Sequence, residues 1–233
     1  MAVECASMSR GKMLRITKLN ECGTVVTGAG SSLVAKAFVS GTFTPNYSDP
    51  SEITTTDANG DRCIDDRGAV DLRWVDVSLV ICTLDPTMIN LITGDPLVLD
   101  DAVAPNTVGF RLDADLTGSA NFALEIWSGI TGQACDPSGF PKYGYWLFPW
   151  LKDAQWGEWV VQNDALTITF TARAVMGSNW GVGPYDDVRR DAVTPATLEA
   201  LLTPIGDSQV MHFEVSSAPL PTPACGAVTL PAP

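Results

Sequence analysis

Apolar and polar side chains alternate with a period of two through several stretches of the chain, and this alternation limits the possible folds more than any other feature. A strand that buries one face of a sheet needs this pattern, because successive side chains point to opposite faces. The clearest stretches are residues 75–81, 108–116, 166–173 and 211–215, and weaker ones lie at 13–19, 33–39, 122–127, 145–150 and 158–161. The sequence therefore predicts a mainly β protein.

Helix signals are few. Asp85 can cap free amides, Pro86 suits the first helical position, and Gly94 can end a helix in the left-handed conformation. These residues predict a helix over 86–93. A second short helix is expected over 195–202, after Thr194, with Leu198, Leu201 and Leu202 facing inward.

With 233 residues, the chain has the length of a single β domain. We expect that domain to span residues 1–217. Residues 218–233 contain five prolines and read as an extended, poorly packed tail.

The chain carries 27 acidic and 14 basic side chains, for a formal charge of −13. This balance argues against a sequence-reading DNA or RNA binder, which needs clustered cations to displace counterions from phosphates. Residues 1–50 have a net charge of +2, whereas residues 51–120 have −9. The subunit is therefore polarised if these segments lie on different surfaces.

The six cysteines show no Cys-x-x-Cys spacing, which excludes zinc knuckles and thioredoxin-type motifs. Cys82, inside an apolar stretch, is interpreted as a small buried side chain. The only histidine, His212, is expected on the polar face of its strand, solvated or hydrogen-bonded. Since no nucleophile motif accompanies it, we expect neither an enzyme nor a cofactor.

A polar segment between Gly41 and Asp71 shows no sustained periodicity, and segments of this length are usually functional or disordered. It contains a set of possible calcium ligands, Asp57, Asn59, Asp61 and Asp65, but the spacing fails the EF-hand pattern. The Asn-Gly pair favours a solvated turn instead. Gly28–Ser32 similarly indicates a hairpin turn rather than a phosphate-binding loop.

Five of the seven tryptophans lie close together in the chain, at Trp146, Trp150, Trp156, Trp159 and Trp180. Three interpretations remain open: a sandwich core, an aromatic platform for sugars, and a hydrophobic subunit interface.

No apolar leader is visible in residues 1–14, and the longest apolar stretch, around residues 77–84, is too short to cross a bilayer. We therefore expect synthesis in the cytoplasm with reduced thiols, and no membrane partner.

Five segments in order carry a resemblance to a known family. They are RITKLNECG (15–23), DANGDRCIDDRG (57–68), DLRWVDVSLVICTLDPTMINLITG (71–94), GYWLFPWLKDAQWGEW (144–159) and SNWGVGPYD (178–186). Together they resemble the major tail tube proteins of long-tailed bacteriophages, and most closely those of phages that infect actinobacteria. The resemblance extends from about residue 13 to 216.

The resemblance implies an antiparallel β-sandwich or barrel with one short flanking helix. It also implies a structural virion protein whose six copies close a ring. Stacked rings surround a tape-measure protein, meet the tail terminator and distal tail proteins, and later conduct double-stranded DNA into the host. In the family a long loop or hairpin bridges subunits, and residues 42–70 are the candidate for it. The family supplies no catalytic residues.

Several residues are candidates for roles in such a tube. Arg111, Asp113 and Asp115 are expected to face the lumen, where acidic side chains repel phosphates. The basic side chains Arg10, Lys12 and Arg15 would suit head-to-tail stacking. The expected subunit interface comprises Trp146, Trp150, Trp156, Trp159, Trp180, Asp57 and Arg62.

An alternative function is a carbohydrate-binding β-sandwich on a virion or cell surface, suggested by the tryptophans and the possible calcium loop. A hydrolase is disfavoured by the single histidine and the missing nucleophile motif.

Overall fold

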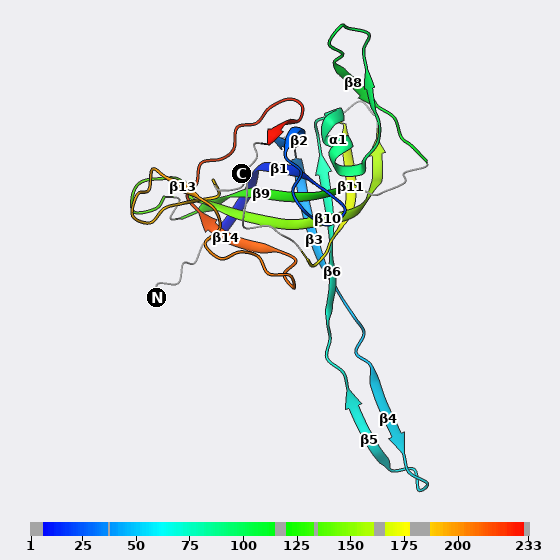
Figure 1. Cartoon of the computed structure of the whole chain (residues 1–233). Helices are drawn as coiled ribbons and strands as arrows, with labels where there is room; N and C mark the ends of the chain where they lie inside the picture. The colour runs from blue at the N-terminus through cyan, green and yellow to red at the C-terminus, as the bar shows by residue number, and fades with distance from the viewer. Residues whose placement is uncertain are drawn as a thin grey trace.

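The structure is a computed structural model, and it describes residues 7–36, 38–114, 120–132, 135–160, 166–177 and 187–230. Over these ranges the chain is mainly β, all strand pairs are antiparallel, and one short α-helix flanks the sheets (Figure 1). The expected fold class is confirmed.

Nine strands in the described ranges form the main sheet, in the order β15-β2-β1-β9-β10-β11-β6-β3, with β14 paired to β10. Their bounds are β1 Ser7–Leu19, β2 Gly28–Ala35, β3 Phe38–Tyr47, β6 Leu72–Ile81, β9 Asn121–Thr131, β10 Tyr143–Val160, β11 Thr167–Ala174, β14 His212–Ser216 and β15 Val228–Leu230. Three small hairpins complete the set: β4 Glu52–Thr56 with β5 Arg62–Arg67, β7 Leu97–Leu99 with β8 Thr107–Phe110, and β12 Arg189–Arg190 with β13 Leu198–Glu199.

Strand β10 belongs to both layers of the sandwich. Its first part, Tyr143–Leu147, lies between β9 and β14, whereas its second part, Leu151–Val160, pairs with β11. Strands β15, β2, β1 and β9 thus continue into one layer, and β11, β6 and β3 into the other. This division places two sheets face to face across one core.

The core between the layers joins Leu14 and Ile16 of β1 to Val77 and Leu79 of β6, and helix α1, Pro86–Thr93, packs against it. A second apolar cluster lies on the far face of β1, β9 and β10, where Tyr145 is buried with Trp127 under residues from the 188–205 and 220–230 segments. Strand β9 therefore buries side chains on both faces, which is why its sequence alternates weakly.

The helix is bounded by the residues that the sequence indicated. The Asp85 carboxylate accepts the backbone N–H groups of Thr87 and Met88, Pro86 occupies the first turn, and Gly94 ends the helix at φ 84°. The prediction of a helix over 86–93 is confirmed.

The predicted strand 108–116 is wrong beyond Phe110, where β8 ends. After this point the N–H of Arg111 donates to the carbonyl of Pro96, and the N–H of Asp113 donates to the Asp95 carboxylate. These bonds turn the chain toward the end of α1, so the alternation at 111–114 belongs to a loop. Asp115 lies outside the described residues.

The predicted helix over 195–202 is absent. The Arg190 guanidinium donates to the Pro195 carbonyl at 2.7 Å, which occupies an acceptor that the first helical turn would use. A tight turn then brings Leu198–Glu199 back as β13 beside β12. Leu201 is buried as expected, but Leu202 is exposed.

Three strand boundaries also differ from expectation. The described part of 33–39 divides between β2 and β3, whereas 145–150 and 158–160 are parts of the single strand β10, and residue 161 is outside the described residues. Gly28–Ser32 is not a turn: it begins β2, and the connection from β1 is made by residues 20–27.

Cys82 directly follows buried Ile81 and, by alternation, points outward, so it is exposed rather than buried.

The C-terminal segment is mostly exposed, as expected of an extended tail, but it is attached to the body at several points. Strand β15 pairs with β2, and Ala218 and Leu230 are buried. The N–H of Gly226 also donates to the Asp85 carboxylate at 2.8 Å, which ties this segment to the start of α1. Apolar residues between the prolines make these contacts: Leu220 and Leu230 pack on the second apolar cluster, and Ala227 packs on the core between the layers.

Candidate functional site

The hairpin of β4 and β5 extends away from the body as a narrow arm (Figure 1). Every residue of both strands is exposed. The expected long segment at 42–70 is thus an ordered hairpin, with residues 42–47 still inside β3. Two-stranded hairpins are marginally stable alone in water, so an arm of this kind gains from contact with another surface.

The two faces of the arm differ in chemistry. Opposite pairs share a face, so the pairs Ile53–Asp66 and Thr55–Ile64 place both isoleucines on the same side. The other side carries Glu52 opposite Arg67 and Thr54 opposite Asp65. Ile53 and Ile64 are 57% and 51% exposed, which leaves the isoleucine face without cover in the single chain.

The arm ends in the turn that the Asn-Gly pair favoured. The Asp57 carboxylate accepts the N–H groups of Asn59 and Asp61, and Gly60 has φ 89°. Asp65 pairs instead with Arg62 at 2.6 Å. Among the described residues, no group of three or more His, Cys, Asp or Glu side chains is arranged to hold a metal ion. The interface candidates Asp57 and Arg62 both lie near the tip of the arm.

Three of the tryptophans have their indole N–H groups bonded inside the fold. Trp146 donates to Ser128, Trp150 to Asn121 and Trp156 to Asp95. Trp156 also packs against the rings of Phe110, Phe170 and Trp159. Trp159 alone of these four is largely exposed, at 48%, and Trp180 lies outside the described residues. Trp146, Trp150 and Trp156 are therefore partly buried against the core, as the core interpretation expects, while their expected role in a subunit interface stays a prediction.

The outer face of β3, β6 and β11 is rich in hydroxyl groups. Strand register aligns its side chains in three rows across the sheet: Ser40, Val80 and Thr169; Thr42, Ser78 and Thr171; Thr44, Asp76 and Arg173. The only charged residues in these rows, Asp76 and Arg173, lie 4.0 Å apart and cancel. The face is thus polar and neutral overall, although the chain is strongly acidic.

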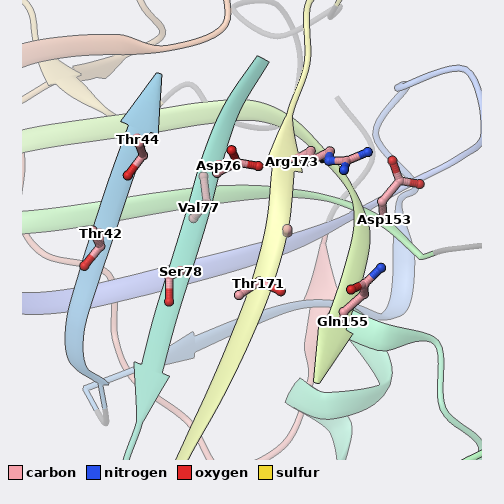
Figure 2. Close-up of a pocket in the computed structure, with 10 residues that line it drawn as sticks. Thr42, Thr44, Asp76, Val77, Ser78, Asp153, Gln155, Thr171 and Arg173 are labelled. Carbon is pink, nitrogen blue, oxygen red and sulfur yellow. Dashed lines mark ion pairs between the residues drawn. The ribbon is translucent and has the colours of Figure 1, made fainter. Parts of the chain in front are cut away.

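A shallow cavity of about 240 Å³ lies on this face and continues onto β10 (Figure 2). Asp153 and Gln155 border it beside Thr171 and Arg173. Asp153 has φ 55° at an irregularity in the pairing of β10 with β11, a conformation that costs energy for a residue with a side chain. Alternating threonines at 42, 44, 169 and 171 were the sequence signal for this face, which our sequence analysis missed.

Two of the three lumen candidates, Arg111 and Asp113, do not lie on this sheet, and Asp115 is outside the described residues. Both are exposed in the loop after β8. The premise that they line the polar face of a strand is therefore wrong.

A buried ionic cluster was also missed. The guanidinium of Arg15 on β1 donates two hydrogen bonds to the carboxylate of Glu125 on β9, and the Tyr145 hydroxyl donates a third at 2.7 Å. Burial raises the pKa of Glu125, while Arg15 and Tyr145 oppose that shift. Burial also disfavours the charged form of Arg15, but Glu125 outweighs it and raises the Arg15 pKa. Arg15 is thus unavailable for exposed stacking contacts.

His212 is more buried than expected, whereas its neighbour Phe213 is 40% exposed. Strand β14 directs His212 toward the ring of Tyr145 and leaves its Nε2 atom 3.5 Å from a Glu214 carboxylate oxygen. The expected position on the polar face, solvated or hydrogen-bonded, is therefore wrong: the Nε2 atom of His212 is buried and has no hydrogen-bond partner in the described structure.

No family model matches this chain, and no curated protein is significantly similar to it. The described residues contain no helix that is both long and apolar enough to cross a membrane.

Proposed function

We propose that this chain is a structural protein of a bacteriophage virion, the major subunit of a tail tube built from stacked hexameric rings. The arm is the observation that carries the proposal. Its isoleucine face, which also carries Thr55 and Asp66, has no partner within the described chain, and two exposed isoleucines on an ordered hairpin favour assembly with other copies. The family resemblance supplies the form of that assembly.

Free strand edges support ring closure. Within the described residues, β3 pairs only with β6, and Lys152–Val160 of β10 pair only with β11. Strands β10, β11, β6 and β3 alternate in direction, so β3 of one copy can meet β10 of the next in antiparallel pairing. Such contacts close a ring and remove the exposed edges, which otherwise promote irregular aggregation.

The neutral hydroxyl face of β3, β6 and β11 then suits the wall of a conduit. Each lysine or arginine that neutralises a phosphate adds salt-dependent affinity for DNA, and this face has no unpaired cation in its three rows. Double-stranded DNA would pass without specific binding. A tape-measure protein, a tail terminator and distal tail proteins are the further partners in this proposal.

Negative-stain microscopy of the concentrated purified protein tests the proposal. We expect tubes or six-fold rings. Deletion of residues 52–67 with a short glycine-serine replacement should leave a folded monomer and abolish these assemblies. A wild-type protein that stays monomeric at high concentration and is retained on a glycan column would instead favour the carbohydrate-binding alternative.

A further inference from the structure

An apolar groove of about 670 Å³ opens at the end of the body from which the arm leaves. It lies between strand β3, which supplies Phe43 and Tyr47, and the β14 side, which supplies Met211 and Phe213, with Trp146 at its base. Tyr47, Met211 and Phe213 are all exposed. Uncovered aromatic and methionine side chains are typical of protein interfaces.

No acidic residue lines this groove, although the chain has a formal charge of −13. His212 is its only ionisable lining residue besides the phenol of Tyr47. Because no carboxylate lines the groove, an apolar segment that has acidic residues beside it can bind there with little electrostatic repulsion.

The β7–β8 hairpin has these properties, and it projects from the opposite end of the body, beyond α1 (Figure 1). Leu99, Val103 and Val108 are exposed on it, and Val103 at the tip is completely exposed. Asp100 and Asp101 supply acidic neighbours. The Asp100 carboxylate accepts the N–H of Ala102 and both the backbone N–H and the side-chain amide of Asn106, so the tip is ordered before binding.

We propose that the tip of the β7–β8 hairpin of one copy inserts into the apolar groove of a second copy. Because the two surfaces lie at opposite ends, this contact is head-to-tail and repeats without closing, as a stack requires. The arm is a poorer occupant for the groove of a coaxial copy. It leaves the body at the groove end, so coaxial copies would have to meet groove end to groove end and would close after two. The role of this contact in stacking rings rests on the proposed function, whereas the contact between two copies is argued from the two surfaces alone.

Site-specific photocrosslinking tests the contact. We would replace Val103 with p-benzoylphenylalanine and, as a control, make the same replacement at Val193, which is 89% exposed on another surface. Irradiation of the assembled protein should join two copies through position 103, with crosslinked peptides that contain residues 43–47 or 208–213. Crosslinks from position 103 to other segments, or none in assembled tubes, would overturn the proposal.

A charge substitution supplies a second readout. Val103→Asp should fold normally, because the side chain is solvated, but rings should stack at least tenfold less well by light scattering and microscopy. Val193→Asp should stack like the wild type. If Val103→Asp forms tubes normally, the docking proposal fails while the proposed function stands. If the wild type forms neither rings nor tubes, yet position 103 still crosslinks to the groove, the proposed function fails and the docking proposal stands.

Discussion

Glu125 shows how single residues set the rigidity of the subunit. Its carboxylate is fully buried, and it accepts hydrogen bonds from the Arg15 guanidinium of β1 and the Tyr145 hydroxyl of β10. Removing two charges from water costs several kcal/mol per ion before their attraction is counted. The cluster therefore contributes little net stability as a pair, but the loss of one member leaves an uncompensated charge.

Glu125→Gln should lower the free energy of unfolding by about 3–5 kcal/mol, because the buried Arg15 guanidinium loses its main counterion and keeps the half-exposed Asp187 carboxylate, 3.7 Å away. Urea denaturation measures the change. Arg15→Met combined with Glu125→Gln should recover most of the loss. Asp76→Asn, at the exposed pair with Arg173, should cost at most about 1 kcal/mol. Equal losses at the two sites would contradict this account of the cluster.

Asp100 makes the tip of the β7–β8 hairpin sensitive to acid. Hydrogen bonds from the Asn106 side chain and backbone, and from the N–H of Ala102, lower the pKa of Asp100 below its ordinary value of 3.8. A depressed carboxyl pKa stabilises the folded tip above that ordinary value, and the contribution disappears as the pH falls below 3.8 through the folded pKa. Amide exchange at Asn106 should accelerate over that range, and Asp100→Asn should reduce the dependence. If the protection of the Asn106 amide, measured relative to its intrinsic exchange rate at each pH, does not fall over that range, the prediction is wrong.

At the scale of the element, the sequence predicted structure well where a feature depends only on residues that are close together in the chain. Asp85, Pro86 and Gly94 bound α1 because capping and left-handed termination are local. Prediction failed where distant groups decide. The Arg190 guanidinium donates to the Pro195 carbonyl, which a helix would otherwise use. The Asp95 carboxylate accepts the N–H of Asp113 in the loop that follows β8. Arg15 pairs with Glu125, which is 110 residues away in sequence. The hydroxyl face needed the register of β3, β6 and β11, which no single stretch contains.

Asp85 performs two functions that can be separated. One carboxylate oxygen caps α1, and the other accepts the N–H of Gly226. Asp85→Asn keeps one acceptor and should retain the helix while hydrogen exchange near β15 accelerates. Asp85→Ala should also lose about 1 kcal/mol of stability through the missing cap. If Asp85→Asn leaves exchange at Val228–Leu230 unchanged, the link to Gly226 is not what holds the C-terminal segment.

The isoleucine face of the arm should matter to assembly and not to folding. Ile53→Ser with Ile64→Ser changes exposed side chains, so the free energy of unfolding should change by less than about 0.5 kcal/mol. Assembly should fall at least tenfold by analytical ultracentrifugation. Thr54→Ala with Glu52→Gln, on the opposite face, is the matched control. Equal effects of the two double variants would show that the faces are equivalent.

At the scale of the whole molecule, the distribution of charge matters more than its total. The chain has a formal charge of −13, but two of its surfaces carry no net charge. These are the lining of the apolar groove and the three rows of the hydroxyl face. Repulsion between acidic copies opposes close packing unless contacts avoid like charges, and salt screens it. A groove without lining carboxylates and a hydroxyl face whose three rows contain no unpaired cation fit the proposed arrangement, in which copies would meet through apolar surfaces and DNA would meet hydroxyl groups.

The wall assignment can be tested by adding the cations that it lacks. Thr42→Lys with Thr171→Lys places two positive charges in one row of the hydroxyl face, at exposed positions that should not disturb the fold. Tubes of this variant should retain double-stranded DNA in a filter assay, with affinity that falls steeply as salt rises, because each neutralised phosphate releases counterions. The wild type should retain almost none. Val193→Lys provides a control for added charge outside the wall. If the double variant forms tubes that still release DNA freely, whereas Asp113→Lys causes retention, the lumen is lined by the loop after β8 and not by this sheet.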